Sequence, residues 1–367
     1  MKEIKAVVEA YHKIDFTKNK AALASVVRVE GSSYRRTGAR MLIVDSGEWI
    51  GGISGGCLEG DALKKAKFAM VQNKATMVTY DTTDDDPYQI GVGLGCNGII
   101  DVLLTPLDSQ NTNNQVLTLQ DCIESRHPNI IITVTHLKGN IKNIQLGQAY
   151  KYDIEIDFSL NFISENLLID INDCLQSEKS ETKVYPCQDG EVTIFIEVII
   201  PATHLILFGE NYDIYPMVKL AKEIGWKVSV ICNPLKVHKL LFELADNVLE
   251  KDRSKEIEID SYTVALLMAH DYETDFKNMR NLLKTNIKYI GMLGPKKRTD
   301  KMFLKLSEEG NSISVEDLAR IATPVGLDIG ASNPEEIAIS IIAEIKTFFT
   351  RRTGQRLKFR EGAIYEN

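Results

Sequence analysis

The chain lacks a long hydrophobic run and an excess of basic residues. Its most apolar stretch, residues 192–208, is interrupted by Glu197, Pro201 and His204, so it predicts two strands joined by a turn rather than a membrane span. Residues 1–16 are charged and helix-like, without the apolar segment of a secretory signal. With 43 Lys and Arg against 51 Asp and Glu, the net charge is −8. This balance argues against nucleic acid or an anionic membrane as a partner.

Closely spaced cysteines are also missing. The six cysteines are scattered over 367 residues and form no Cys-x-x-Cys pair. Such spacing does not resemble a disulfide framework, and it disfavours a closed structural zinc site. We therefore expect a cytoplasmic protein with reduced thiols. Four of the cysteines are predicted to be core or incidental residues: Cys122, Cys174, Cys187 and Cys232.

The length and the pattern of apolar segments predict two α/β domains. Apolar segments at 204–208, 226–231, 262–269 and 287–292 alternate with helical segments such as 214–224. This alternation is typical of a doubly wound parallel sheet. The first half instead mixes a few helices with short strands, expected at 21–29, 41–44, 75–79, 99–104 and 130–134. We predict a mixed α/β domain at 1–200, a Rossmann-like domain at 201–350 and a tail at 351–367.

Residues 111–185 carry no motif that can be interpreted. Within them, the polar stretch that begins at residue 176 and ends at residue 183 is predicted to be a surface loop.

Two glycine-rich segments each carry a cysteine. Cys57 lies in Gly-Gly-Ile-Ser-Gly-Gly-Cys-Leu-Glu (51–59), and Cys96 lies in Gly-Val-Gly-Leu-Gly-Cys-Asn-Gly (91–98). Glycine is retained where the main chain takes a positive φ or approaches another group closely. A helix expected at 58–72 would place Cys57 near the positive end of a helix dipole, which favours the thiolate. The alternative is that each small thiol simply fills a tight turn, and the sequence does not show whether the two cysteines meet.

Gly209 occupies the strand-to-helix turn where a dinucleotide fingerprint would lie. Asn211 and Ile214 stand where the second and third glycines are expected, and no acid follows the next strand at residues 232–234. We expect a Rossmann-like scaffold with weak or absent binding of NAD(P), while a working NAD(P) site is the alternative.

Taken together, the motifs resemble the xanthine dehydrogenase accessory factor (XdhC/CoxI) family. The matching segments are Gly-Ser-Ser-Tyr-Arg-Arg-Thr-Gly-Ala-Arg-Met (31–41), Ser-Gly-Gly-Cys-Leu-Glu (54–59), Gly-Leu-Gly-Cys-Asn-Gly (93–98), His-Asp-Tyr-Glu (270–273), Tyr-Ile-Gly-Met-Leu-Gly (289–294), Pro-Val-Gly-Leu-Asp-Ile-Gly (324–330) and Asn-Pro-Glu-Glu-Ile-Ala (333–338). The chain departs from the family pattern at Tyr34 and Thr37, where prolines are usual, and at Ala322, near which a histidine is common.

The resemblance implies an accessory protein that binds molybdenum cofactor (molybdopterin). It also implies support for exchanging an oxygen ligand of molybdenum for sulfur, and delivery of the product to a xanthine dehydrogenase-type molybdenum hydroxylase. Such a protein is a carrier rather than a turnover enzyme. A cysteine desulfurase is a further candidate partner, and a homodimer would enclose the large ligand between its subunits.

This expectation assigns roles to particular residues. Cys57 is the candidate molybdenum contact, Cys96 a second candidate thiol, and Gly55 and Gly56 would bring main-chain N–H groups to the cofactor. Arg36 and Arg40 are candidates for binding its phosphate, although arginines in a loop are commonly a solvated surface. Glu59 is predicted to favour the helix start.

In the second domain, Gly209 and His270 complete the predicted cofactor-binding set. A capped, structurally satisfied histidine is the alternative for His270. Two other functions compete with the carrier: an NAD(P)-dependent oxidoreductase that uses the second domain, and a structural adaptor whose sites have decayed.

Overall fold

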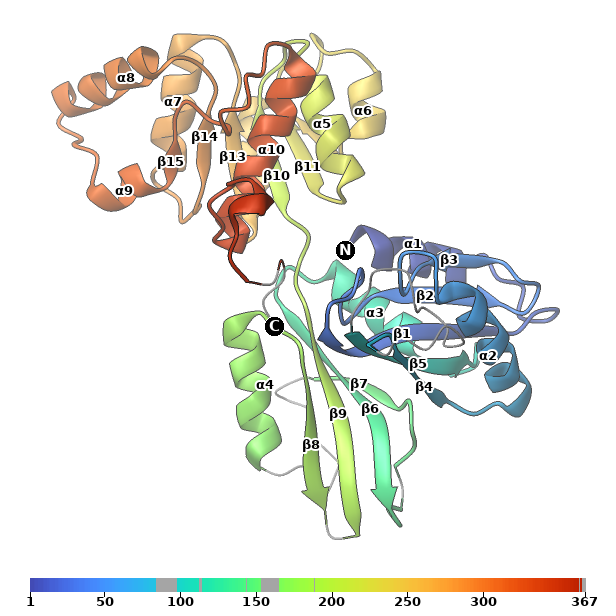
Figure 1. The fold of residues 1–367 in the computed structure, drawn as a ribbon. Helices are drawn as coiled ribbons and strands as arrows, with labels where there is room; N and C mark the ends of the chain where they lie inside the picture. The colour runs from blue at the N-terminus through green and yellow to red at the C-terminus, as the bar shows by residue number, and fades with distance from the viewer. Residues whose placement is uncertain are drawn as a thin grey trace. The chain divides into compact units, whose positions relative to one another are not determined.

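The chain folds into two compact units in a computed structural model, and each unit is described by itself (Figure 1). The structure describes residues 1–83, 98–111, 114–142, 144–152, 165–187, 189–362 and 364. The first unit ends at Pro201 and the second runs from Ala202 to Ile364. Among these described residues, none of the helices combines the length and apolarity needed to cross a bilayer.

The first unit contains a five-stranded antiparallel sheet in the order β3-β2-β1-β5-β4. Its strands are β1 (Ala21–Gly31), β2 (Arg40–Val44), β3 (Trp49–Gly51), β4 (Thr76–Asp81) and β5 (Gly98–Leu107). Helix α2 (Glu59–Gln72) packs on one face through Ala62, Ala66 and Ala69, whose small side chains let the helix approach the sheet closely. The other face packs against α1 (Lys2–Tyr11) and α3 (Gln115–Glu124).

A second antiparallel sheet follows in the same unit, in the order β7-β6-β9-β8. It consists of β6 (Asn129–Gly139), β7 (Ala149–Lys151), β8 (Glu181–Cys187) and β9 (Gly190–Ile199), with α4 (Glu165–Ser177) packed against it (Figure 1). The loop predicted at 176–183 is therefore wrong at both ends, because α4 continues to Ser177 and β8 begins at Glu181.

The second unit is a six-stranded parallel sheet in the order β12-β11-β10-β13-β14-β15. The strands are β10 (His204–Phe208), β11 (Lys227–Ile231), β12 (Asn247–Leu249), β13 (Thr263–Leu267), β14 (Ile290–Met292) and β15 (Ile321–Ala322). The first four helices are α5 (Ile214–Glu223), α6 (Leu240–Leu244), η1 (Lys251–Glu256) and α7 (Tyr272–Leu282). They are followed by α8 (Lys296–Glu308), α9 (Val315–Ala319), α10 (Pro334–Thr350) and η2 (Leu357–Phe359).

Helices cover both faces of this parallel sheet. Met217 of α5 and Ile341 of α10 pack into the core on one face, while Phe276 of α7 and Met302 of α8 pack into the core on the other. The predicted doubly wound, Rossmann-like fold is thus confirmed. The strand order runs outward in both directions from β10 and β13, so the carboxyl ends of these two strands form the switch point at which such sheets bind ligands.

Candidate functional site

The turn that carries Cys57 joins the end of β3 to the start of α2. At its beginning, Gly51 has a φ of +86°, and a Cβ there would stand 2.3 Å from the carbonyl oxygen of Arg40. Only glycine fits this position, because any side chain would both strain the backbone and collide with β2. The glycine-rich segment therefore forms a fixed turn between an edge strand and a helix.

Two polar side chains of the turn hold its main chain. Glu59 Oε1 accepts hydrogen bonds from the N–H groups of Ile53 (3.1 Å) and Ser54 (2.8 Å), and Glu59 Oε2 accepts one from the Ser54 hydroxyl. The Ser54 Oγ in turn accepts from the N–H groups of Gly56 (3.2 Å) and Leu58 (3.1 Å). The cysteine thiol also lies 3.4 Å from Ser54 Oγ.

These contacts keep Glu59 ionised. Burial raises the pKa of the Glu59 carboxyl, but the hydrogen bonds from Ser54 and from the main chain outweigh burial, so the pKa lies below its ordinary value. Glu59 thus does more than favour the helix start electrostatically: it organises the whole turn.

The turn does not offer the open phosphate cradle expected from the sequence. The N–H groups of Ile53 and Ser54 already bind Glu59, and those of Gly56 and Leu58 already bind the Ser54 hydroxyl. Four main-chain donors, the Gly56 N–H among them, are thereby satisfied within the chain, while the role predicted for Gly55 stays a prediction. The observed contribution of the two glycines is steric: Gly56 has a φ of +112° with open space beside its Cα, and a Cβ on Gly55 would stand 3.4 Å from the Tyr34 ring.

Cys57, the residue after Gly56, is half-buried and packs partly against the core under α2. Three other cysteines differ from it in being fully buried. Burial raises the pKa of the thiols of Cys122, Cys174 and Cys232 to about 11, which keeps them protonated and unreactive. Cys187 is half-buried, like Cys57. Cys96 lies outside the described residues.

Arg40 has an internal partner. Its guanidinium is buried, forms an ion pair with Glu197 of β9 and donates to the Gly38 carbonyl oxygen at 2.7 Å. Its charge is thus neutralised between the two sheets, and the phosphate contact stays a prediction. Arg36 is half-buried in the loop before β2.

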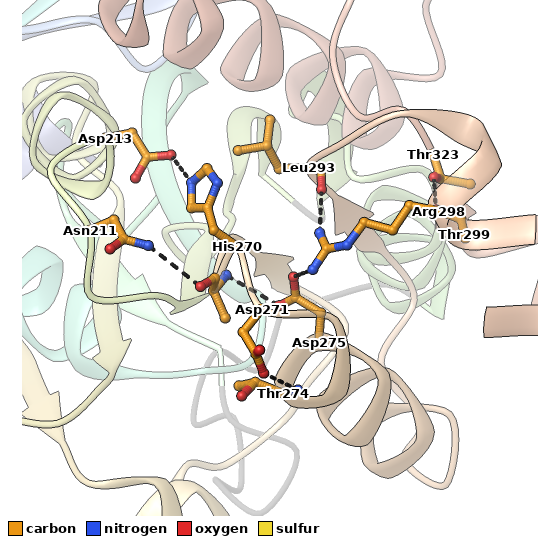
Figure 2. A network of polar contacts seen from close by, with 11 residues as sticks. Asn211, Asp213, His270, Asp271, Thr274, Asp275, Leu293, Arg298, Thr299 and Thr323 are labelled. Atoms are coloured by element: carbon orange, nitrogen blue, oxygen red, sulfur yellow. Dashed lines mark hydrogen bonds and ion pairs between the residues drawn. The ribbon is translucent and has the colours of Figure 1, made fainter. Parts of the chain in front are cut away.

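In the second unit, His270 lies at the switch point, after β13. It adopts a left-handed backbone conformation with a φ of 58°, which is uncommon for a residue other than glycine. Its imidazole Nε2 lies 2.6 Å from Oδ2 of Asp213, at the start of α5, and half of its side chain is exposed (Figure 2). Because an ionised carboxylate can only accept, the ring N–H at Nε2 donates to it.

The loop that carries His270 is clamped by a buried ion pair. Asp275 of α7 is 1% exposed, accepts a hydrogen bond from the Ala269 N–H at 3.2 Å and pairs with Arg298 of α8 at 2.8 Å (Figure 2). Burial raises the pKa of Asp275 above its ordinary value, although Ala269 and Arg298 partly offset it. The clamp therefore fixes the position from which His270 reaches Asp213.

We expect Arg298→Ala to destabilise the second unit by roughly 2 kcal/mol near neutral pH, because it leaves the Asp275 charge buried without its cation. The pKa of Asp275 is higher in the folded state than in the unfolded state, so ionising this carboxyl lowers the stability of the fold. This loss of stability is complete above the folded-state pKa and is absent below the unfolded-state pKa. The loss should therefore shrink as the pH falls toward 3.8, the ordinary pKa of the group. Urea unfolding across this range measures it, with Arg253→Ala in an exposed pair as control. A loss that stays constant with pH would contradict the assignment.

The switch point lacks the second and third glycines of a dinucleotide fingerprint, because Asn211 and Ile214 stand in their places. Gly209 is buried, and a Cβ there would stand 2.8 Å from the Met268 carbonyl oxygen and 3.0 Å from Ile214. The glycine thus serves packing. At the end of β11, where an acid would bind the ribose, the Asn233 N–H donates instead to Glu210 at 3.0 Å. The residues present do not support the NAD(P) site that the sequence left open.

Sequence reasoning missed Asp213, Asp275 and Arg298 as one network, because they come from three different helices, at the start of α5, in α7 and in α8. Asp275 alone gave a signal: it is an acid on the otherwise apolar face of α7. Within the described residues, no group of three or more His, Cys, Asp and Glu side chains is placed to hold a metal ion.

Comparison with family models finds two matches. Residues 205–345 match the XdhC Rossmann domain, and residues 17–81 match the XdhC and CoxI family. The first match covers the parallel sheet with the His270 network, and the second covers the turn that carries Cys57.

Similar proteins extend over nearly the whole chain. A probable xanthine dehydrogenase subunit of Bacillus subtilis is 32% identical over 339 residues, which cover 89% of this chain and 92% of the relative. The molybdenum cofactor insertion chaperone PaoD of Escherichia coli is 22% identical over 325 residues, which cover 89% of this chain and 82% of the chaperone. A crystal structure of a xanthine dehydrogenase from Bacillus halodurans superposes with a TM-score of 0.71 at 27% identity, covering 96% of each chain.

Proposed function

Since this chain belongs to the XdhC and CoxI family, as its motifs indicated, we propose that it binds molybdenum cofactor as cargo and supports its insertion into a xanthine dehydrogenase-type hydroxylase. The names of two relatives support this role: one is a probable component of xanthine dehydrogenase, and the other is a molybdenum cofactor insertion chaperone. Both align with 89% of the chain, so the similarity is not confined to the common Rossmann-like scaffold.

The observation that carries the proposal is the half-buried thiol of Cys57, the residue that follows Gly56 in the turn. Thiolate sulfur is a soft ligand, suited to a metal that is already bound by a dithiolene. The rigid turn presents this sulfur at a fixed point, because Gly51 and the Glu59 hydrogen bonds determine its main chain. Cys57 is therefore the proposed molybdenum contact, and Cys96 remains a second candidate.

The finer steps of the proposed role are those that the family resemblance implies. The protein would hold the cofactor while an oxygen ligand of molybdenum leaves as water and sulfur from a cysteine desulfurase takes its place, with a thiol reductant supplying the two electrons that bring persulfide sulfur to the sulfide level. It would act as a cytoplasmic carrier rather than a turnover enzyme, and a homodimer would shield the large ligand. The mixed α/β domain at 1–200 would bind the metal end through Cys57, and His270 of the Rossmann-like domain at 201–350 is a separate candidate for cofactor binding.

Purification from cells that make molybdenum cofactor tests the proposal. We expect molybdenum and molybdopterin to co-purify with the wild-type chain in comparable, stoichiometric amounts. A molybdenum hydroxylase purified from the same cells controls for cofactor supply. A wild-type chain free of pterin beside a loaded hydroxylase would refute the carrier role and favour a structural adaptor.

A further inference from the structure

Glu59 occupies the place of an external anion at the start of α2. Its carboxylate receives the N–H groups of Ile53 and Ser54 together with the Ser54 hydroxyl. Gly52 leaves room for the carboxylate, since a Cβ there would stand 3.2 Å from Glu59 Oε1. Successive main-chain N–H groups that converge on one point in a turn are a common binding site for an anion. Here the chain itself supplies the anion.

We propose that Glu59 is a built-in anion that organises the Cys57 turn and keeps the phosphate end of the cargo away from it, so that the cofactor approaches the sulfur with its metal end. The orientation of the cargo rests on the proposed function, whereas the built-in anion does not. Glu59 is thus a positioning residue: it acts through the turn and through its charge.

The neighbouring acid of the same helix turn provides a matched comparison. Asp61 also lies in the first turn of α2, but its carboxylate accepts from the Tyr80 hydroxyl at 2.8 Å and pairs with Lys65 at 2.8 Å. Asp61 therefore bonds to side chains rather than to the main chain of the turn. Replacing it removes an equal charge two residues away and leaves the donors of the turn bound to Glu59.

An anion-rescue experiment on the full chain tests the built-in anion. Glu59→Ala vacates three donors, so formate or inorganic phosphate should stabilise this variant by about 3 °C in thermal unfolding and leave the wild type unchanged. Asp61→Ala should resemble the wild type. Equal responses of the Glu59→Ala and Asp61→Ala variants to both anions would overturn the proposal.

A second measurement does not depend on the alanine variant folding. Cys57 is alkylated with anionic iodoacetate and, separately, with neutral iodoacetamide. The rate with iodoacetate is divided by the rate with iodoacetamide, both measured on the Cys57 peptide by mass spectrometry. Both reagents react with the thiolate, so the fraction of ionised Cys57 cancels in this ratio. The ratio therefore reports the charge around the sulfur. Glu59→Gln should raise the ratio about threefold at low salt, because the carboxylate that repels the anionic reagent is gone. An unchanged ratio, or an equal rise in Asp61→Asn, would contradict the proposal.

Neither measurement uses the cofactor. Success in both, with no pterin on the wild-type chain, would refute the proposed function and leave the role of Glu59 intact. Pterin on the wild type with an unchanged reagent ratio would refute only the built-in anion.

Discussion

Replacing Glu197 with alanine is expected to lower the free energy of unfolding of the first unit by about 3–5 kcal/mol, because the change leaves the charge of Arg40 buried and unpaired. The two side chains are only 7% and 5% exposed. Arg40 comes from β2 of the five-stranded sheet and Glu197 from β9 of the four-stranded sheet, so the pair joins the two sheets of the unit.

Urea unfolding of the full chain measures this loss. Glu191→Ala is the matched control, since Glu191 lies on the same strand but pairs with Lys138 at the surface, where the two side chains are 47% and 73% exposed. An exposed pair contributes about 0–1 kcal/mol. Similar losses in Glu197→Ala and Glu191→Ala would show that the buried pair does not hold the sheets together.

The Rossmann-like unit was the most predictable part of the chain. A parallel sheet buries both faces of its strands, which makes them short apolar runs separated by amphipathic helices. The runs at 204–208 and 226–231 therefore appear as β10 and β11 almost residue for residue. In these two strands, the local sequence pattern and the buried environment both favour a strand.

The edge strand β8 of the four-stranded sheet was not predictable, for a physical reason. Strand β8 lies at an edge of this sheet, and much of it is exposed or half-exposed, so its sequence carries charges instead of an apolar run. Glu181 and Lys183 consequently favoured a loop. The pairing of β8 with β9 provides the missing stabilisation, and no local pattern reports it.

The candidate site shows the same division. The glycines indicated a tight turn that carries Cys57, and the structure has that turn. The roles of its charged residues depended on partners that sequence spacing does not reveal. Arg40 is paired with a residue 157 positions away, and His270 contacts one 57 positions away. The sequence motif shows that these residues are charged or polar, and only the structure shows their internal partners.

Cys57→Ala is expected to lower the molybdopterin retained by the purified chain roughly tenfold or more, since removal of even an indirect partner of a metal costs 10–100-fold in affinity. Cys57→Ser keeps the size of the side chain and replaces soft sulfur with hard oxygen, so this variant should also lose most of the retained molybdopterin. The fold should survive both changes, because the main chain of the turn is held by Ser54 and Glu59.

Cys187→Ala controls for the loss of a thiol. Cys187 is half-buried like Cys57 and belongs to the same unit, but it lies on β8, away from the glycine-rich turn. Its replacement should leave retention unchanged. A structural adaptor, by contrast, would bind its protein partner equally well with either cysteine replaced and would retain no pterin.

The direct test is therefore the molar ratio of molybdopterin to protein in the wild type, Cys57→Ala, Cys57→Ser and Cys187→Ala, purified in parallel from cofactor-producing cells. We predict full loading of the wild type and of Cys187→Ala, with near-complete loss in both Cys57 variants. Wild-type loading of a folded Cys57→Ala chain would contradict the assignment of this sulfur as the cofactor contact.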